Sequence, residues 1–154
     1  MTASFKIVPG MFNVDEDEIF RRALETAKEK FVVRDMRDEL GILLSDDPSK
    51  YDIPDSPDAP GMLVASYGNK INGAAVICDT DLLRNVAQKY DSDILIIPSS
   101  IHECILVVNC DQIQSDMASF DFMVQEVNNT EVDEEERLSD HVYVYRRDTG
   151  KIVY

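Results

Sequence analysis

Ser99, Ser100, His102 and Glu103 bring a hydroxyl, an imidazole and a carboxylate together within five positions. These are the side chains of a nucleophile, a general base and an orienting acid, which perform acyl transfer or hydrolysis when they converge within hydrogen-bond reach. In an extended segment, however, Ser100 and His102 are about 6–7 Å apart and Glu103 points to the opposite face. We therefore interpret the segment as a turn whose hydroxyls satisfy backbone groups and whose histidine holds the loop. A hydrolase that uses Ser99 or Ser100 with His102, or with His141, is kept as an alternative.

Metal and cofactor chemistry have little support in the sequence. The two histidines, His102 and His141, do not have the spacing of a ligand pattern with nearby carboxylates. The acidic run from Glu131 to Arg137 lacks the alternating ligands and the central glycine of a calcium-binding loop. There is also no glycine-rich strand-to-helix turn of the Rossmann or P-loop type. We predict neither a cofactor nor a metal.

Thirty Asp and Glu residues against fifteen Lys and Arg residues give a net charge of −15. Such a charge repels the phosphates of nucleic acids and anionic membranes, so we expect no direct binding to either. The common interpretation of the excess is a solvated coat that keeps the protein soluble. The alternative is an acidic surface that contacts a basic partner protein. The candidate contact residues form the densest acidic run in the chain: Glu131, Asp133, Glu134, Glu135 and Glu136.

The chain has 154 residues, of which 44% are hydrophobic, and this is enough for a single compact domain over residues 1–154. No apolar run approaches the roughly 20 residues of a transmembrane helix, and the first residues lack the layout of a secretory signal. The three cysteines, Cys78, Cys104 and Cys110, have no metal-type spacing, and we expect buried free thiols in a reducing compartment. The sequence thus predicts a soluble cytoplasmic protein.

Residues 1–44 are predicted to form a helical N-terminal segment. Asn13 to Glu18 supply a capping residue and acidic side chains, and apolar residues recur at helical spacing from Ile19 to Phe31. A second helix is expected over about residues 34–44. Residues 45–61 hold four prolines and five aspartates, so they are predicted to form a long exposed loop.

The remainder, residues 62–154, is predicted to fold in the order ββαββαββ. This order favours an α+β domain with a mostly antiparallel sheet and helices on one face, on which the N-terminal segment packs. The apolar runs 94–97 and 104–108 are expected to be adjacent central strands that are buried on both faces. The other expected elements are a hairpin of strands 62–67 and 73–78, a helix capped by Asp79 or Thr80, a helix started by Asp111 and Gln114 and ended by Asn128-Asn129, and a hairpin of strands 141–145 and 151–154.

Four short segments carry a family resemblance: Asn72-Gly-Ala-Ala75, Ile97-Pro-Ser-Ser-Ile-His-Glu103, Glu126-Val-Asn-Asn-Thr130 and Leu138-Ser-Asp-His-Val-Tyr-Val-Tyr145. Together, across most of residues 8–148, they resemble an uncharacterised family of anaerobic Gram-positive bacteria, the domain of unknown function family 5688. The resemblance implies a cytoplasmic bacterial protein associated with mobile elements, without an established activity or catalytic residues. Family members extend further at the N-terminus, which leaves open whether the chain is complete or one module of a longer protein.

Taken together, these patterns favour an acidic protein-binding or accessory domain without catalytic activity, whose partner is another protein. A sharper alternative is an anti-defence inhibitor, whose acidic surface mimics nucleic acid and occupies the basic groove of a host enzyme. The hydrolase is the third hypothesis. The sequence makes no prediction of the oligomeric state.

Overall fold

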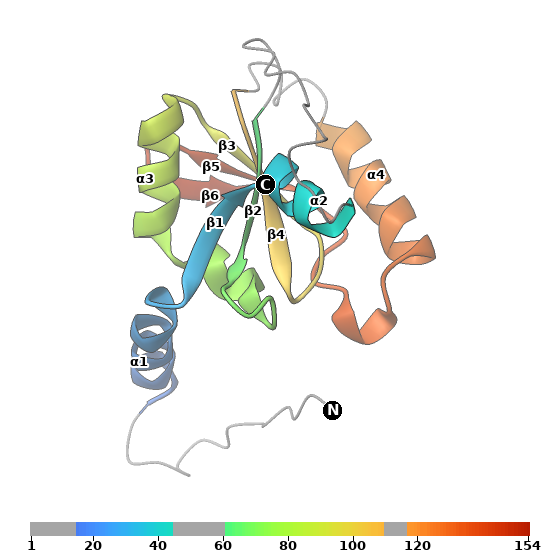
Figure 1. Cartoon of the computed structure of the whole chain (residues 1–154). Coiled ribbons are helices and arrows are strands. Elements are labelled where there is room, and N and C mark those ends of the chain that lie inside the picture. Colours follow the sequence, from blue (N-terminus) through green and yellow to red (C-terminus); the bar gives the residue numbers. More distant parts are fainter. Residues whose placement is uncertain (1–14, 45–60, 110–116) are drawn as a thin grey trace. The chain divides into compact units, whose positions relative to one another are not determined.

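The computed structural model describes residues 15–44, 61–109 and 117–154 (Figure 1). The chain divides into two compact units, Met1–Lys30 and Phe31–Tyr154. No helix of the described residues is long and apolar enough to cross a bilayer. Several residues that the sequence analysis singled out lie outside the described ranges, namely Asn13, Cys110, Asp111, Gln114 and almost all of the predicted 45–61 loop.

The first unit contains helix α1 (Glu16–Lys28). Asp15 caps its N-terminus, because the carboxylate accepts a hydrogen bond from the Glu18 N–H at 2.7 Å. The prediction of a helix is confirmed, but its extension to Phe31 was wrong. Phe31 begins a strand in the second unit, where its ring stacks on Tyr67 with centroids 5.0 Å apart.

The second unit is built on a six-stranded antiparallel sheet with the order β1-β2-β4-β3-β5-β6. The predicted α+β class, the antiparallel sheet and the two adjacent central strands are therefore confirmed. The strands are β1 (Phe31–Asp35), β2 (Gly61–Tyr67), β3 (Ile94–Pro98), β4 (Glu103–Val108), β5 (Tyr143–Arg146) and β6 (Lys151–Val153).

Strand β1 was not predicted, because Phe31 was assigned to the end of the first helix and Arg34 and Asp35 to the start of the second. Its β-branched residues Val32 and Val33 favour extended backbone, and β1 pairs with β2 along its whole length. The second predicted helix is confirmed as α2 (Met36–Leu44), which starts directly after this strand.

The predicted strand 73–78 is instead a 3₁₀ helix, η2 (Gly73–Cys78). The backbone N–H groups of Gly73 and Ala74 donate to the carbonyls of His102 and Ile101, so they are not available for a ladder with β2. A Cβ atom at Gly73 would lie 2.1 Å from the backbone nitrogen of Tyr67. Only glycine allows this close approach of two backbones.

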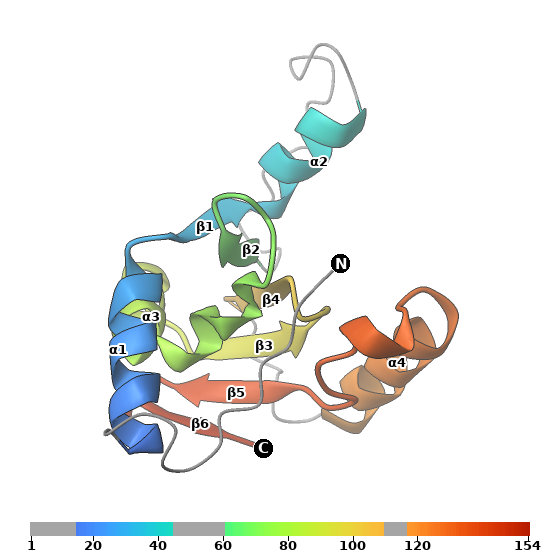
Figure 2. The same ribbon diagram turned by 90° about the horizontal axis from the view of Figure 1, so that it is seen from below.

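Helices cover both faces of the sheet rather than one, which corrects the predicted arrangement. Helix α3 (Thr80–Tyr90) and η2 pack on one face, and helix α4 (Met117–Thr130) packs on the other (Figures 1 and 2). Strand β3 shows why both layers are needed, because its side chains alternate between the two cores: Ile94 and Ile96 face α3, and Leu95 and Ile97 face α4.

Candidate functional site

The turn between β3 and β4 holds the predicted Ser/His/Glu motif. The Ser100 hydroxyl accepts a hydrogen bond from the His102 backbone N–H at 3.1 Å, and the Ser100 N–H donates to the Glu103 carbonyl. Glu103 is half-buried and starts β4 opposite Ser66, and Ser99 is also half-buried. These are the hydrogen bonds that the interpretation as a turn requires.

Both nitrogens of the His102 ring have partners in this turn. Nδ1 accepts the Asn72 backbone N–H at 3.0 Å, and Nε2 lies 3.3 Å from the Glu136 carboxylate. Because Nδ1 is an acceptor, we assign the proton of the neutral ring to Nε2, from which it can donate to Glu136. In the described part of the chain no serine hydroxyl bonds to this ring, so the geometry is that of an anchor rather than of a nucleophile and base pair.

The backbone of the same turn forms hydrogen bonds with three other segments of the chain. The His102 carbonyl accepts from the Gly73 N–H at 2.9 Å and from the Ser66 hydroxyl at 2.7 Å. The Ile101 N–H donates to the Glu136 carbonyl at 2.8 Å. Glu136 ends the short 3₁₀ helix η4 (Glu134–Glu136), so the turn fastens η2 and η4 to the centre of the sheet.

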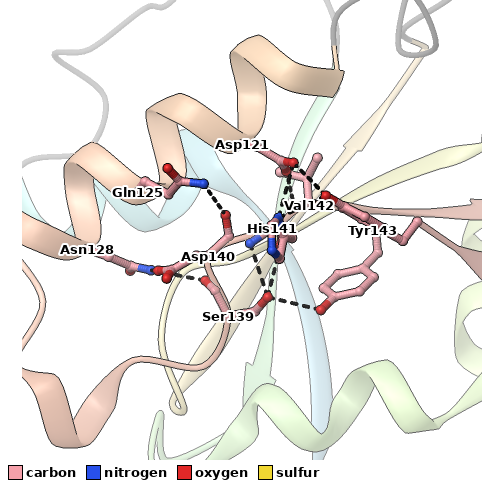
Figure 3. A network of polar contacts seen from close by, with 9 residues as sticks. Asp121, Gln125, Asn128, Ser139, Asp140, His141, Val142 and Tyr143 are labelled. Carbon is pink, nitrogen blue, oxygen red and sulfur yellow. Dashed lines mark hydrogen bonds and ion pairs between the residues drawn. The ribbon is translucent and has the colours of Figure 1, made fainter.

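A second polar network joins α4 to the chain before β5 (Figure 3). Asp121, Gln125 and Asn128 lie one or two helical turns apart, so their side chains point from the same side of α4. The Asp121 carboxylate accepts the Val142 N–H at 2.8 Å. The Asn128 amide donates to the Ser139 carbonyl at 3.0 Å and to the Asp140 carboxylate at 2.7 Å, and the Gln125 amide donates to the Asp140 carbonyl.

His141 forms an Asp–His pair within this network. Its Nδ1 lies 3.2 Å from the Asp121 carboxylate and 3.1 Å from the Tyr154 hydroxyl. Such a pair can prepare Nε2 as a general base. The Ser139 hydroxyl, however, bonds to the His141 backbone N–H and to the Tyr143 hydroxyl, not to the ring. Within the described ranges, no serine, threonine or cysteine side chain is hydrogen-bonded to this imidazole.

The acidic run follows α4 and is held in place at one end. Glu136 is bound through its carboxylate and its carbonyl, as described above, and the Arg137 guanidinium donates to the Val132 carbonyl. Of the described residues, none forms an ion pair with the other carboxylates of the run, which are exposed: Glu131, Asp133, Glu134 and Glu135.

Carboxylates elsewhere in the molecule are often neutralised by a neighbouring cation. This is so on α1, at the end of β1, on α3 and beside the final hairpin. The pairs are Glu18 with Arg21 and Arg22, Asp35 with Arg37, Asp81 with Arg84, Asp93 with Arg146, and Asp91 with Arg147. The run Glu131–Glu135 therefore differs from these sites because, among the described residues, no neighbouring cation neutralises its carboxylates.

A buried carboxylate on α2 is also paired. Glu39 is 6% exposed and contacts Arg34 of β1 at 2.8 Å and Lys70 of the loop after β2. Hydrogen bonds from Lys70 and then Arg34 lower the pKa of Glu39 below its usual value. This group therefore stays ionised and ties β1, α2 and the loop together.

Metal ligation and thiol chemistry are not favoured by the side chains that the structure describes. The described residues contain no group of three or more His, Cys, Asp or Glu side chains that could hold a metal ion. Burial raises the pKa of Cys104 to about 12, and partial burial also raises the pKa of Cys78. Both thiols are thus poor nucleophiles at neutral pH. The prediction that Cys78 is buried was wrong, because its side chain is exposed at the end of η2.

An open cavity of about 490 Å³ lies beside β1, β2 and α3. Several of its charged side chains are already engaged, Arg34 with Glu39 and Asp35 with Arg37. None of the predicted site residues lines it. The lining residues are Val33, Arg34, Asp35, Asp38, Leu63, Val86, Lys89 and Tyr90.

The sequence matches a family model described as a family of unknown function (DUF5688) over residues 8–147, and the chain belongs to this family. No curated protein and no solved structure matches it. The four segments that carry the family resemblance meet in pairs in the structure. Asn72-Gly-Ala-Ala75 contacts the His102 turn, and Asn128 contacts Ser139 and Asp140 of the segment before β5.

Proposed function

We propose that this protein is a non-catalytic binding domain that contacts a basic partner protein through its acidic run. The observation that carries the proposal is the set of exposed carboxylates from Glu131 to Glu135, which have no cationic partner among the described residues. Uncompensated charge on an anchored segment attracts an oppositely charged partner at long range.

The two histidine sites support a binding role over a catalytic one. At His102 both ring nitrogens are occupied by structural partners. At His141 the nearby serine bonds to backbone and to a tyrosine. A hydrolase would need a nucleophile hydrogen-bonded to one of these rings, or a rearrangement that provides it.

The experiment is affinity capture from the native host, followed by association kinetics with the captured protein. The test variant carries Asp133→Asn, Glu134→Gln and Glu135→Gln, and it leaves the anchor Glu136 intact. We expect an on-rate lower by about tenfold at low salt and a flatter dependence on salt concentration, because steering by exposed charges is screened over about 8 Å at physiological ionic strength.

A matched control removes three exposed acids from other elements, Glu29→Gln, Asp38→Asn and Asp148→Asn. It changes the net charge equally, so it separates the local effect of the run from the effect of total charge. Equal on-rates for the test variant and the parent across the salt titration would contradict the proposal.

A second candidate function is inhibition of a nucleic-acid enzyme by charge mimicry. The same unpaired carboxylates favour it, because a run of exposed negative charges can occupy a groove that binds phosphates. Competition distinguishes the two candidates. A mimic is displaced from the captured partner by duplex DNA or RNA, whereas a partner with a different contact surface stays bound.

A further inference from the structure

Strand β1 forms one edge of the sheet. It pairs with β2 alone, and among the described residues of the second unit no strand pairs with its outer edge. Alternate residues of β1 therefore direct their N–H and C=O groups away from the sheet. Edge strands are usually protected by shortness, by proline or by lysine. Strand β6, at the opposite edge, has three residues and begins with Lys151, whereas β1 has five residues and begins with three apolar ones. Of the two edges, β1 is the better suited to pairing with a further strand.

The open cavity of about 490 Å³ lies directly over this edge strand. Val33 and Asp35 line it from the face of the sheet that packs on α3, and Arg34 between them lines it as well. The facing wall is α3, through Val86 and residues 89–90. The cavity is therefore a groove between a free strand edge and a helix, and its volume lies within the range of about 300–1,000 Å³ that is typical of ligand pockets.

The charged groups at the groove leave a cation without an acidic partner. Asp35 and Asp38 share Arg37, whose pKa is raised first by the hydrogen bond to Asp35 and, to a smaller extent, by the charge of Asp38. Lys89 forms no ion pair with the described residues, and its ammonium lies over the Tyr90 ring, 5.2 Å from the centroid.

The remaining charges at the groove do not compensate Lys89. Arg34 and Lys70 share the carboxylate of Glu39, so they add no free acid. This small positive excess contrasts with the net charge of −15 of the whole chain. Charge complementarity therefore favours an acidic group in whatever occupies the groove.

We propose that an extended segment of a partner protein adds to the outer edge of β1 as a further strand, places an apolar side chain in the groove against Val33 and Val86, and pairs an acidic side chain with Lys89. This surface shares no residue with the acidic run, so the proposal goes beyond the proposed function and does not depend on it.

The extended form of the segment follows from the backbone of β1. Its outward N–H and C=O groups recur at every second residue, which is the spacing at which another strand presents its own groups. The side chains at alternate positions of an added strand point to the same face of the sheet. On the α3 side that face is the groove, so main-chain hydrogen bonds provide affinity and the groove selects the side chain, as in other cases of strand addition.

A second copy of the chain is the alternative occupant. Two β1 strands could pair around a two-fold axis. Such a contact would bring two chains of net charge −15 together and would leave each Lys89 without an acid on the added strand. We therefore expect the isolated protein to be free of a dimer that buries β1.

The test uses three synthetic peptides of about six residues, the length of an ordinary strand. Each alternates threonine with an apolar residue, which is valine, leucine or phenylalanine, and each has one glutamate in place of a threonine. One comparison peptide has the same side chains with N-methyl groups on its central residues, and a second has lysine in place of glutamate. We expect at least one of the three peptides to bind at concentrations up to millimolar and its N-methylated form to bind at least tenfold more weakly, because it lacks the N–H donors.

Hydrogen exchange provides the readout that is specific to strand addition. On binding, the amides of every second residue of β1 should become protected, and the resonances of residues 86–90 on α3 should shift. Protection at β6 instead of β1, equal affinity of the N-methylated peptide, or no binding by any of the three peptides would overturn the proposal.

Charge exchange tests the contact with Lys89. Lys89→Glu should weaken binding of the glutamate peptide about tenfold and should bind the lysine peptide more tightly than the parent does. Lys151→Glu is the matched control, because it makes the same change of charge at an exposed lysine on the opposite edge strand, and it should leave both affinities unchanged. Equal effects of the two variants would contradict the assignment of Lys89. A dimer in sedimentation in which the β1 amides are protected without peptide would overturn the proposal in favour of a second copy.

Discussion

Asp121 allows a sharp test of the network between α4 and β5. Its side chain is 15% exposed, and its two oxygens serve the Val142 N–H, the His141 ring and the Tyr154 hydroxyl. Asp121→Ala removes all three contacts. Asp121→Asn keeps one carbonyl oxygen, which can still accept the Val142 N–H.

The expected cost of Asp121→Ala follows from the burial of each partner. Val142 is fully buried, so its N–H loses its acceptor at a cost of about 1–3 kcal/mol. His141 and Tyr154 are exposed, so the loss of their contacts adds little. The higher helix propensity of alanine returns up to about 0.7 kcal/mol. The net loss of unfolding free energy is therefore about 2 kcal/mol for Asp121→Ala and below about 1 kcal/mol for Asp121→Asn.

Urea unfolding followed by circular dichroism measures these differences, provided that the dependence of the free energy on urea is the same for each variant. Gln125→Ala is the control on the same side of α4. Its single hydrogen bond is long, at 3.5 Å, and exposed, so we expect a change below about 0.5 kcal/mol. Equal losses for the Ala and Asn variants of Asp121, or a loss below about 0.5 kcal/mol for Ala, would refute the assignment of the Val142 contact.

Two further substitutions test other parts of the fold. Gly73→Ala should lower the unfolding free energy by more than about 3 kcal/mol or prevent folding, because its Cβ would overlap the backbone at Tyr67. Gly68→Ala is the control, because its Cβ meets open space and should leave the thermal midpoint unchanged or raised. Equal thermal midpoints of the two variants would contradict this prediction. Glu39→Gln should cost about 1–2 kcal/mol at neutral pH, less than for a fully buried pair because Arg34 and Lys70 are half exposed. Since pairing lowers the pKa of Glu39, its contribution is complete above the unfolded value of about 4.5 and disappears as the pH falls through the lower folded value. A difference between parent and variant that does not shrink in acid would exclude this cause.

The sequence predicted the elements whose pattern is strong and local. The apolar runs of β3 and β4, the helix from Thr80 and the final hairpin all appear where periodicity and turn residues placed them. The 73–78 segment was misread because its apolar residues also suit a strand. What decides its form is the contact of Gly73 with a turn about thirty residues away, which periodicity does not report.

The candidate site was predicted in part. The residue types of the turn are enough to predict the hydrogen bond between Ser100 and the backbone of the turn. They do not predict that Glu136, 34 residues away, is the partner of His102. Asp121 was not singled out, and Asn128 was considered only as the end of a helix and as part of a family segment. Their position on the same side of α4 as the apolar residues Phe120 and Val124 is a signal that could have identified them, since polar residues on an inner face need buried partners.

The position of the β3–β4 hairpin has a consequence for how the sheet assembles. Residues 99–102 close this hairpin, whereas the pairing of β2 with β4 and of β3 with β5 joins segments tens of residues apart. The entropy lost on closing a loop rises with its length, so the hairpin can form before either flanking strand arrives. Its two outer edges then offer a template of unpaired backbone groups to β2 on one side and β5 on the other. In this order of events the His102 turn is present from the beginning. It then offers the His102 and Ile101 carbonyls as acceptors to η2 and the Ile101 N–H as a donor to η4.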